Sequence, residues 1–149
     1  MTRVAAREYA VITVYGLDCN PDAELLLEER LGSEFFERYA SLKERAGPPP
    51  DAEQSAYIRR VTLGVAAHLA ELDSYIEKYA INWGFARLPR MTVAILRVCM
   101  FEVLYMRDEV PAAAAINAAI DISKQYESAE VTGFTNGILG AFSRKETGV

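Results

Sequence analysis

Arginine is the residue type in this sequence whose placement best suits a chemical task, the binding of phosphate groups. Arg3 and Arg7 stand four residues apart, which puts both on one face of a helix. A second group within 84–107 sets four arginines against one carboxylate: Arg87, Arg90, Arg97 and Arg107 against Glu102. This excess indicates a local basic patch, although solvated arginines scattered around a helical bundle explain it equally well.

Other residue types that carry chemistry form no recognised motif. His68 is the only histidine and has no serine, cysteine or carboxylate placed to make a catalytic dyad, so we expect it to be packed or solvated. Cys19 and Cys99 lack metal-binding spacing and are predicted to be reduced, buried, small hydrophobic residues. The sequence has no His-Glu-x-x-His, no Gly-x-Ser-x-Gly and no glycine-rich phosphate loop after a strand. We therefore expect neither an enzyme nor a metal site.

Length and charge narrow the class of protein further. A chain of 149 residues with 51% hydrophobic content can bury one sizeable core, so we expect a single domain over 1–149. The formal net charge of -5 argues against a protein whose affinity comes mainly from neutralising phosphates. Because charged residues interrupt the N-terminus, we expect no signal peptide and a cytoplasmic location.

The stretch 90–106 is the element that must position the others. Between Val93 and Met106 only Arg97 and Glu102 carry charge, so a helix here needs neighbours on nearly every side. It is too short and too interrupted for a membrane span, which needs roughly 18 apolar residues. We predict a central core helix, in which Arg97 and Glu102 satisfy each other or helix ends.

Helical periodicity and cap signals divide the first half of the chain. A first helix is predicted over 2–17, with an apolar side that includes Val4 and a weakly basic side. A second begins with Asn20 as its cap and Pro21 at its first position, breaks at 32–33, restarts with Ser33 as cap and ends near 45. Prolines then make a stiff connection.

Three further helical segments are predicted after that connection. Asp51 and Gln54 resemble a capping box that opens one helix, whose apolar stripe runs in phase through Ile58, Val61, Val65, Leu69, Leu72 and Ile76. Helices are also expected over 112–126 and over 128–142, the latter despite three internal glycines and the turn-like pair 136–137. No segment alternates like a strand, so the fold class is all-α. From these features alone the protein is a binding or adaptor module.

The same residues, taken in order, resemble those of the NusB family of bacterial transcription antitermination factors. The resemblance rests on short motifs spread over nearly the whole chain: Ala6-Arg7-Glu8, Ala10, Tyr15, Gly64-Val65, Leu88, Ala94-Ile95-Leu96-Arg97, Glu102, Val110-Pro111, Ile116-Asn117, Ala119-Ile120, Lys124, Phe134 and Asn136-Gly137-Ile138-Leu139. Single motifs are weak, but their ordered set is specific.

The resemblance implies an all-helical fold of about seven helices in two packed sub-bundles. It also implies binding to boxA RNA of ribosomal RNA operons together with NusE, a small-subunit ribosomal protein, in an RNA polymerase antitermination complex. Neither a cofactor nor a membrane is implied.

Family residues carry over to matching positions of this chain. The implied RNA contacts are Arg3 and Arg7 for phosphates, Tyr15 as an aromatic contact, and Phe134 and Asn136 at the same surface, with core packing as the alternative for both aromatic residues. The region that faces NusE is implied at 83–90, through Trp83, Arg87 and Arg90, where Trp83 is equally suited to anchor a core.

Departures from the family pattern thin out the positive charge. The usual arginine cluster of the first helix is reduced to Arg3 and Arg7, and Val131, Thr132 and Gly133 stand where a serine and a basic residue are common. We therefore expect weak RNA binding by the isolated protein, with a shallow salt dependence. The alternative is a protein-protein adaptor of the same fold that has lost RNA binding. A domain like those fused to RNA methyltransferases is disfavoured, because no catalytic domain follows 149.

Overall fold

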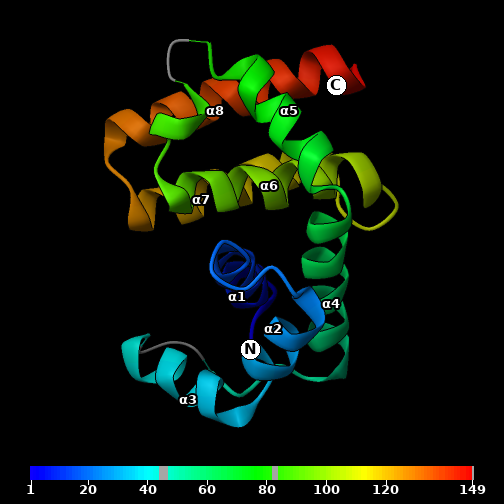
Figure 1. Ribbon diagram of the computed structural model, residues 1–149, viewed down its shortest axis with the longest axis vertical. Helices are drawn as coiled ribbons and strands as arrows, with labels where there is room; N and C mark the ends of the chain where they lie inside the picture. Colours follow the sequence, from blue (N-terminus) through cyan, green and yellow to red (C-terminus); the bar gives the residue numbers. More distant parts are fainter. Residues whose placement is uncertain (44–46, 82–83, 149) are drawn as a thin grey trace. The chain divides into compact units, whose positions relative to one another are not determined.

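Helices account for all regular secondary structure in the computed structural model, which describes residues 1–43, 47–81 and 84–148. Those residues form eight α-helices, one 3₁₀ turn and one π-helical turn, without a strand (Figure 1). The predicted all-α class is confirmed, with one α-helix more than the seven expected. None of the described helices is long and apolar enough to cross a membrane.

Contacts divide the chain into two compact units, Met1–Ala67 and His68–Val149, which we describe separately. The first contains four helices: α1 (Arg3–Gly16), α2 (Ala23–Arg30), α3 (Ser33–Leu42) and α4 (Ala52–Ala67). The second contains α5 (Leu69–Tyr79), η1 (Phe85–Arg87), α6 (Arg90–Tyr105), α7 (Ala112–Tyr126), α8 (Ala129–Phe142) and η2 (Ser143–Thr147). The expectation of a single domain stays a prediction.

In the first unit, α1 packs against α2 and α4 (Figure 1). Tyr9 of α1 is fully buried and meets the rings of α3, with 5.1 Å between its centroid and that of Tyr39 in an edge-to-face arrangement. Its hydroxyl donates a hydrogen bond to the carbonyl of Arg30, and burial raises its pKa to about 12. An aromatic cluster therefore joins α1 to the α2–α3 hairpin.

Helix starts in this unit confirm one cap prediction and correct two. The capping box forms: the Asp51 amide donates to Gln54 Oε1 at 3.0 Å, and the Gln54 amide donates to Asp51 Oδ1 at 2.8 Å. Helix α2 starts later than predicted, because Asp22 caps it while Asn20 accepts from the Asp22 amide in the preceding turn. Gly32, not Ser33, occupies the cap position of α3.

Two predictions of burial in the first unit were wrong. Val4 lies in the first turn of α1 and is 63% exposed, whereas Val11 and Val14 further along the helix are buried. Cys19 is exposed, since it lies in the turn that follows α1. Cys99 is buried and not part of a disulfide, as expected.

The predicted stripe of apolar residues is divided between two helices, contrary to expectation. Helix α4 ends at Ala67, and His68 leaves helical geometry with φ −111° and ψ 20° before α5 begins. Because Leu72 and Ile76 remain fully buried after the break, the apolar period continues in phase and hides it. The His68 ring stacks on that of Tyr105, with 4.3 Å between their centroids.

Helix α6 forms the core of the second unit, packing against α5, α7 and α8 (Figure 1). Every residue from Thr92 to Val103 is buried, which confirms the predicted core helix. Helix α8 also forms as predicted, because Ser128 Oγ accepts from the Val131 amide at 3.2 Å and a hydroxyl pair, Ser123 with Thr132 at 2.9 Å, joins α8 to α7.

Candidate nucleic-acid interface

The two arginines of α1 converge on one aromatic ring. Arg3 Cζ lies 4.4 Å from the ring centroid of Tyr57 on α4, and Arg7 Cζ lies 6.0 Å from the same point. Tyr57 is itself 5% exposed, so its ring is fixed in the unit. Cation–π attraction therefore positions both guanidinium groups at the N-terminal end of α1.

Arg3 is the member of this pair that is open to a ligand. It is exposed and forms no ion pair with any carboxylate of the described residues, whereas Arg7 is only 9% exposed. Thr2 caps the helix by accepting from the Ala5 amide at 3.0 Å, and the first turn contains no acidic residue. Because a helix N-terminus attracts anions, the positive charge of Arg3 is reinforced there.

Tyr15 lies in the last turn of the same helix and is 41% exposed. Ordinary core packing, the alternative for this residue, does not leave that much of a ring in solvent. Twelve residues separate Tyr15 from Arg3, a distance of about 18 Å along the helix axis. The two side chains also lie about 120° apart around the helix axis, so a strand that meets the cation at one end and the ring at the other crosses α1 obliquely.

Helix α8 exposes its backbone at two glycines. A methyl group added at Gly133 or at Gly137 would meet no atom within 4 Å, so the helix surface there is bare. Asn136 is exposed and shares a face with Gly133, three residues before it, whereas Gly137 is the next residue along the helix. Phe134 is partly buried and lies two residues from Asn136, which turns it to another side of the helix.

The predicted RNA contacts thus form two sets within separate units. Arg3, Arg7 and Tyr15 all belong to α1, and Phe134 and Asn136 belong to α8. Their assignment to RNA stays a prediction.

The predicted partner-binding connection lies in the second unit. Arg87 ends η1 and Arg90 begins α6, both exposed, while Leu88 between them is buried. Trp83 falls outside the described residues. At the same end of α6, Thr92 Oγ1 donates to Glu127 Oε1 at 3.2 Å and ties the helix to the end of α7.

Arg97 has a structural role, with a partner that the sequence did not indicate. It binds Asp73 of α5 through two parallel hydrogen bonds, Nε to Oδ1 at 2.8 Å and Nη2 to Oδ2 at 2.9 Å. The Arg97 side chain is 7% exposed and that of Asp73 is 28% exposed. This bidentate pair joins α5 to α6 and removes Arg97 from the candidate binding residues.

A second carboxylate of this unit also holds a cation. Glu146 in η2 accepts hydrogen bonds from Lys78 Nζ at 2.8 Å and from the Tyr79 hydroxyl. These two bonds lower the pKa of the Glu146 carboxyl, and the bond to Glu146 raises the pKa of Lys78. The C-terminal turn is thereby attached to α5.

Tyr57 is the site residue that sequence reasoning missed. It directly precedes Ile58 of the apolar stripe, and nothing in that pattern marks it as a support for Arg3. Only the packing of α4 on α1 brings it beneath the arginines. Among the described residues, no cluster of three or more histidine, cysteine or carboxylate side chains is arranged to hold a metal ion.

Comparison with known proteins places the chain in a family. The family model described as the NusB family matches residues 4–144. A protein of Thermoanaerobacter named transcription antitermination protein NusB is 35% identical over 147 residues, which cover 98% of this chain and 93% of that protein. A NusB homologue from Alkaliphilus oremlandii is 33% identical over 146 residues, with 98% and 96% covered.

Solved structures show the same fold at lower identity. The structure of T. maritima NusB matches with a TM-score of 0.77 at 23% identity, covering 97% of this chain and 92% of that one. The NusB family is one of antitermination factors and not of enzymes. The sequence and the fold agree, and the chain belongs to the NusB family.

Proposed function

We propose that the protein is a transcription antitermination factor that binds boxA-type RNA together with NusE in ribosomal RNA operons. The family match over 4–144 carries the proposal. A solved structure described as antitermination factors NusB and NusE in complex with double-stranded RNA supports it through the shared fold, with a TM-score of 0.70 at 21% identity over 97% of this chain and 98% of that one. The protein acts in the cytoplasm, as part of an RNA polymerase complex.

The α1 face is the RNA side of the proposed complex. Arg3 supplies a cation that no carboxylate of the described residues neutralises, and Tyr15 supplies an exposed ring on which a base can stack. Arg7 contributes chiefly through its position beside Tyr57, since little of its surface is exposed. Phe134 and Asn136 on α8 are separate RNA contacts of the second unit, and Arg87, Arg90 and Trp83 are the residues of that unit that meet NusE.

The direct test is RNA binding by the full chain, with and without NusE. Fluorescence anisotropy at low salt should show that the protein with NusE prefers boxA RNA to a scrambled RNA of the same composition. The isolated protein should bind both weakly, because few cations reach the surface of α1. Equal binding of the two RNAs in the presence of NusE would rule out the proposal.

A protein-protein adaptor without RNA binding is the second candidate, favoured by the burial of Arg7. Arg3→Glu discriminates between the two. It reverses the exposed charge and leaves buried Arg7 in place, so the unit should still fold. An adaptor would bind NusE as before and show no RNA binding to lose, whereas an RNA-binding factor would lose boxA binding in the presence of NusE.

A further inference from the structure

The first unit contains a pocket of about 400 Å³ beside the start of α3. Its wall is mostly apolar, with Tyr9, Leu31, Phe36, Pro49 and Pro50, and its other polar side chains are those of Ser33, Glu37 and Ser55. Small-ligand sites begin at about 300 Å³, so a single long side chain fits this space. An apolar wall with one carboxylate suits an aliphatic chain that ends in a positive charge.

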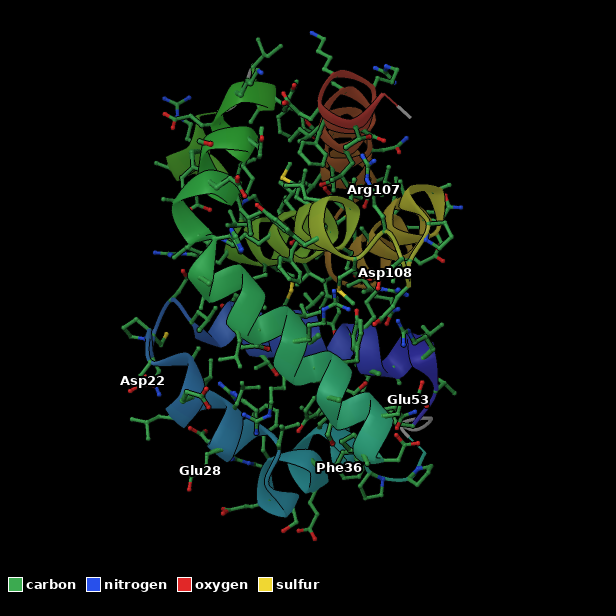
Figure 2. All side chains as sticks on the ribbon, turned by 90° about the vertical axis from the view of Figure 1, so that its right-hand side faces the viewer. Asp22, Glu28, Phe36, Glu53, Arg107 and Asp108 are labelled. Atoms are coloured by element: carbon green, nitrogen blue, oxygen red, sulfur yellow. The ribbon has the colours of Figure 1, made fainter. Side chains whose placement is uncertain are left out.

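Four carboxylates of α2 and α3, of which Glu37 lies in the pocket wall, form no ion pair with the described residues. Glu28 and Glu29 of α2 and Glu34 and Glu37 of α3 are all exposed, and none forms an ion pair within the described parts of the chain. Figure 2 shows Glu28 projecting outward from α2. Four uncompensated negative charges on two adjacent helices attract cations and repel phosphates.

The arginines of the same two helices do not neutralise these charges. Arg30 Cζ lies 4.1 Å from the ring centroid of Phe35, and Arg38 Cζ lies 5.6 Å from it. Both guanidinium groups are thus held on one aromatic ring of α3, and neither pairs with a carboxylate among the described residues.

We propose that this acidic pocket face, formed by the pocket and the carboxylates Glu28, Glu29, Glu34 and Glu37, docks a basic segment of a partner protein. One lysine or arginine of the segment enters the pocket, where its aliphatic stem packs against Phe36 and the prolines and its charge meets Glu37. Neighbouring cations of the segment pair with the other carboxylates. The face is separate from the α1 surface proposed for RNA and gives the factor a second attachment point.

The probes are two peptides of equal charge that differ in stem length. Hexalysine has four methylenes in each side chain, and a hexapeptide of 2,4-diaminobutyric acid has two. Binding to the full chain is measured by nuclear magnetic resonance titration at pH 6.5. Hexalysine should shift the amide signals of Gly32, Ser33, Phe36 and Glu37 and bind about 10-fold more tightly than the short analogue, because two more methylenes enter the pocket.

A pair of double variants with equal charge change separates this face from net charge. Glu34→Gln with Glu37→Gln should weaken hexalysine binding by about 5-fold, as the loss of two exposed ion pairs would. Glu77→Gln with Glu130→Gln removes two exposed carboxylates of the second unit and should change it by less than about 2-fold.

Three results would overturn the proposal. Equal affinity for the two peptides would show that no stem enters the pocket, and equal loss in both double variants would show that binding follows net charge alone. Sedimentation of the chain without peptide supplies the third. If Glu34→Gln with Glu37→Gln dissociates a dimer, the occupant is a second copy of the chain and not a partner's basic segment.

Discussion

Arginines in the two units are held by different kinds of neighbour. Arg97 of the second unit is buried and bound by both oxygens of Asp73, so its charge is neutralised inside the fold. Arg3 of the first unit lies on the ring of Tyr57, and no carboxylate of the described residues neutralises it. An aromatic ring orients a guanidinium group without cancelling its charge, which leaves that charge free for a phosphate.

The comparison shows why the number of arginines in a segment does not predict whether that segment binds phosphates. The range 84–107 contains four arginines, yet its most buried member, Arg97, has a structural role. The N-terminal helix has two arginines, and of these Arg3 is the exposed one that a ligand can reach. The role of each cation follows from what packs beside it, and the predictions below test that difference.

Removal of Arg97 should have the largest effect. Arg97→Met leaves Asp73 without its partner, and because Asp73 is partly exposed we expect a loss of about 2–3 kcal/mol in the free energy of unfolding, below the usual range for a fully buried pair. Urea denaturation measures it. Arg87→Met, at an exposed position of the same unit, should change stability by less than about 0.5 kcal/mol. An unchanged stability for Arg97→Met, with binding lost, would transfer Arg97 to the binding residues.

Truncation of Tyr15 should have the next largest effect, this time on binding. Tyr15→Ala removes a stacking surface and should weaken boxA binding in the presence of NusE by about 1–3 kcal/mol, whereas Tyr15→Phe keeps the ring and most of the affinity. Tyr126→Ala is the matched control, because that ring is similarly exposed, at 37% against 41%. Equal losses for Tyr15→Ala and Tyr126→Ala in anisotropy titrations would remove Tyr15 from the interface.

The ion pair of Lys78 with Glu146 should make a smaller contribution to folding stability, and that contribution should depend on pH. Because the folded state lowers the pKa of Glu146 below its ordinary 4.5, the stabilisation is present above that pH and is lost as the pH falls through the lowered value. The raised pKa of Lys78 has the opposite sign, so its share is present below 10.5 and is lost as the pH rises through the raised value.

Glu146→Gln tests whether the ion pair of Lys78 with Glu146 stabilises the folded protein. The difference in unfolding free energy between the natural protein and the variant should be greatest on the plateau between these limits and should shrink at both ends. Denaturation across a pH series measures it, with Glu130→Gln as an exposed control. A difference that is constant with pH would mean that the pair does not form in solution.

Local signals in the sequence predicted the helices well where cap and period agreed. The capping box of Asp51 and Gln54, the cap Ser128 and the apolar helix that became α6 all formed as expected. The break at His68 was not predictable, because the apolar residues on both sides stay in one helical phase. The predicted start of α2 differs from the observed one because Asn20 and Asp22 are both good caps, and in the structure Asp22 accepts from the Leu25 amide while Asn20 forms the preceding turn.

The residues that contact the arginines from other helices could not be predicted from the sequence, for a physical reason. Asp73 and Tyr57 reach their arginines from other helices, and no periodicity within one segment encodes such a contact. Arg3 and Tyr15 were selected from the sequence through a family resemblance, and their exposure fits the roles they are predicted to have. The burial of Arg7, which limits its access to phosphate, could not be foreseen from its spacing.

The most direct test of the central claim is the salt dependence of boxA binding by the chain with NusE, measured for the natural protein, Arg3→Gln and Arg59→Gln. Arg59 is an exposed arginine on nearly the opposite side of α4 from Tyr57. It forms a surface ion pair with Glu24, with 3.3 Å between Nη1 and Oε2. If Arg3 contacts a phosphate of single-stranded RNA, Arg3→Gln should reduce the slope of log affinity against log salt by about 0.7, and Arg59→Gln should leave it unchanged. Identical slopes for all three proteins would contradict the claim that α1 presents its free cation to RNA.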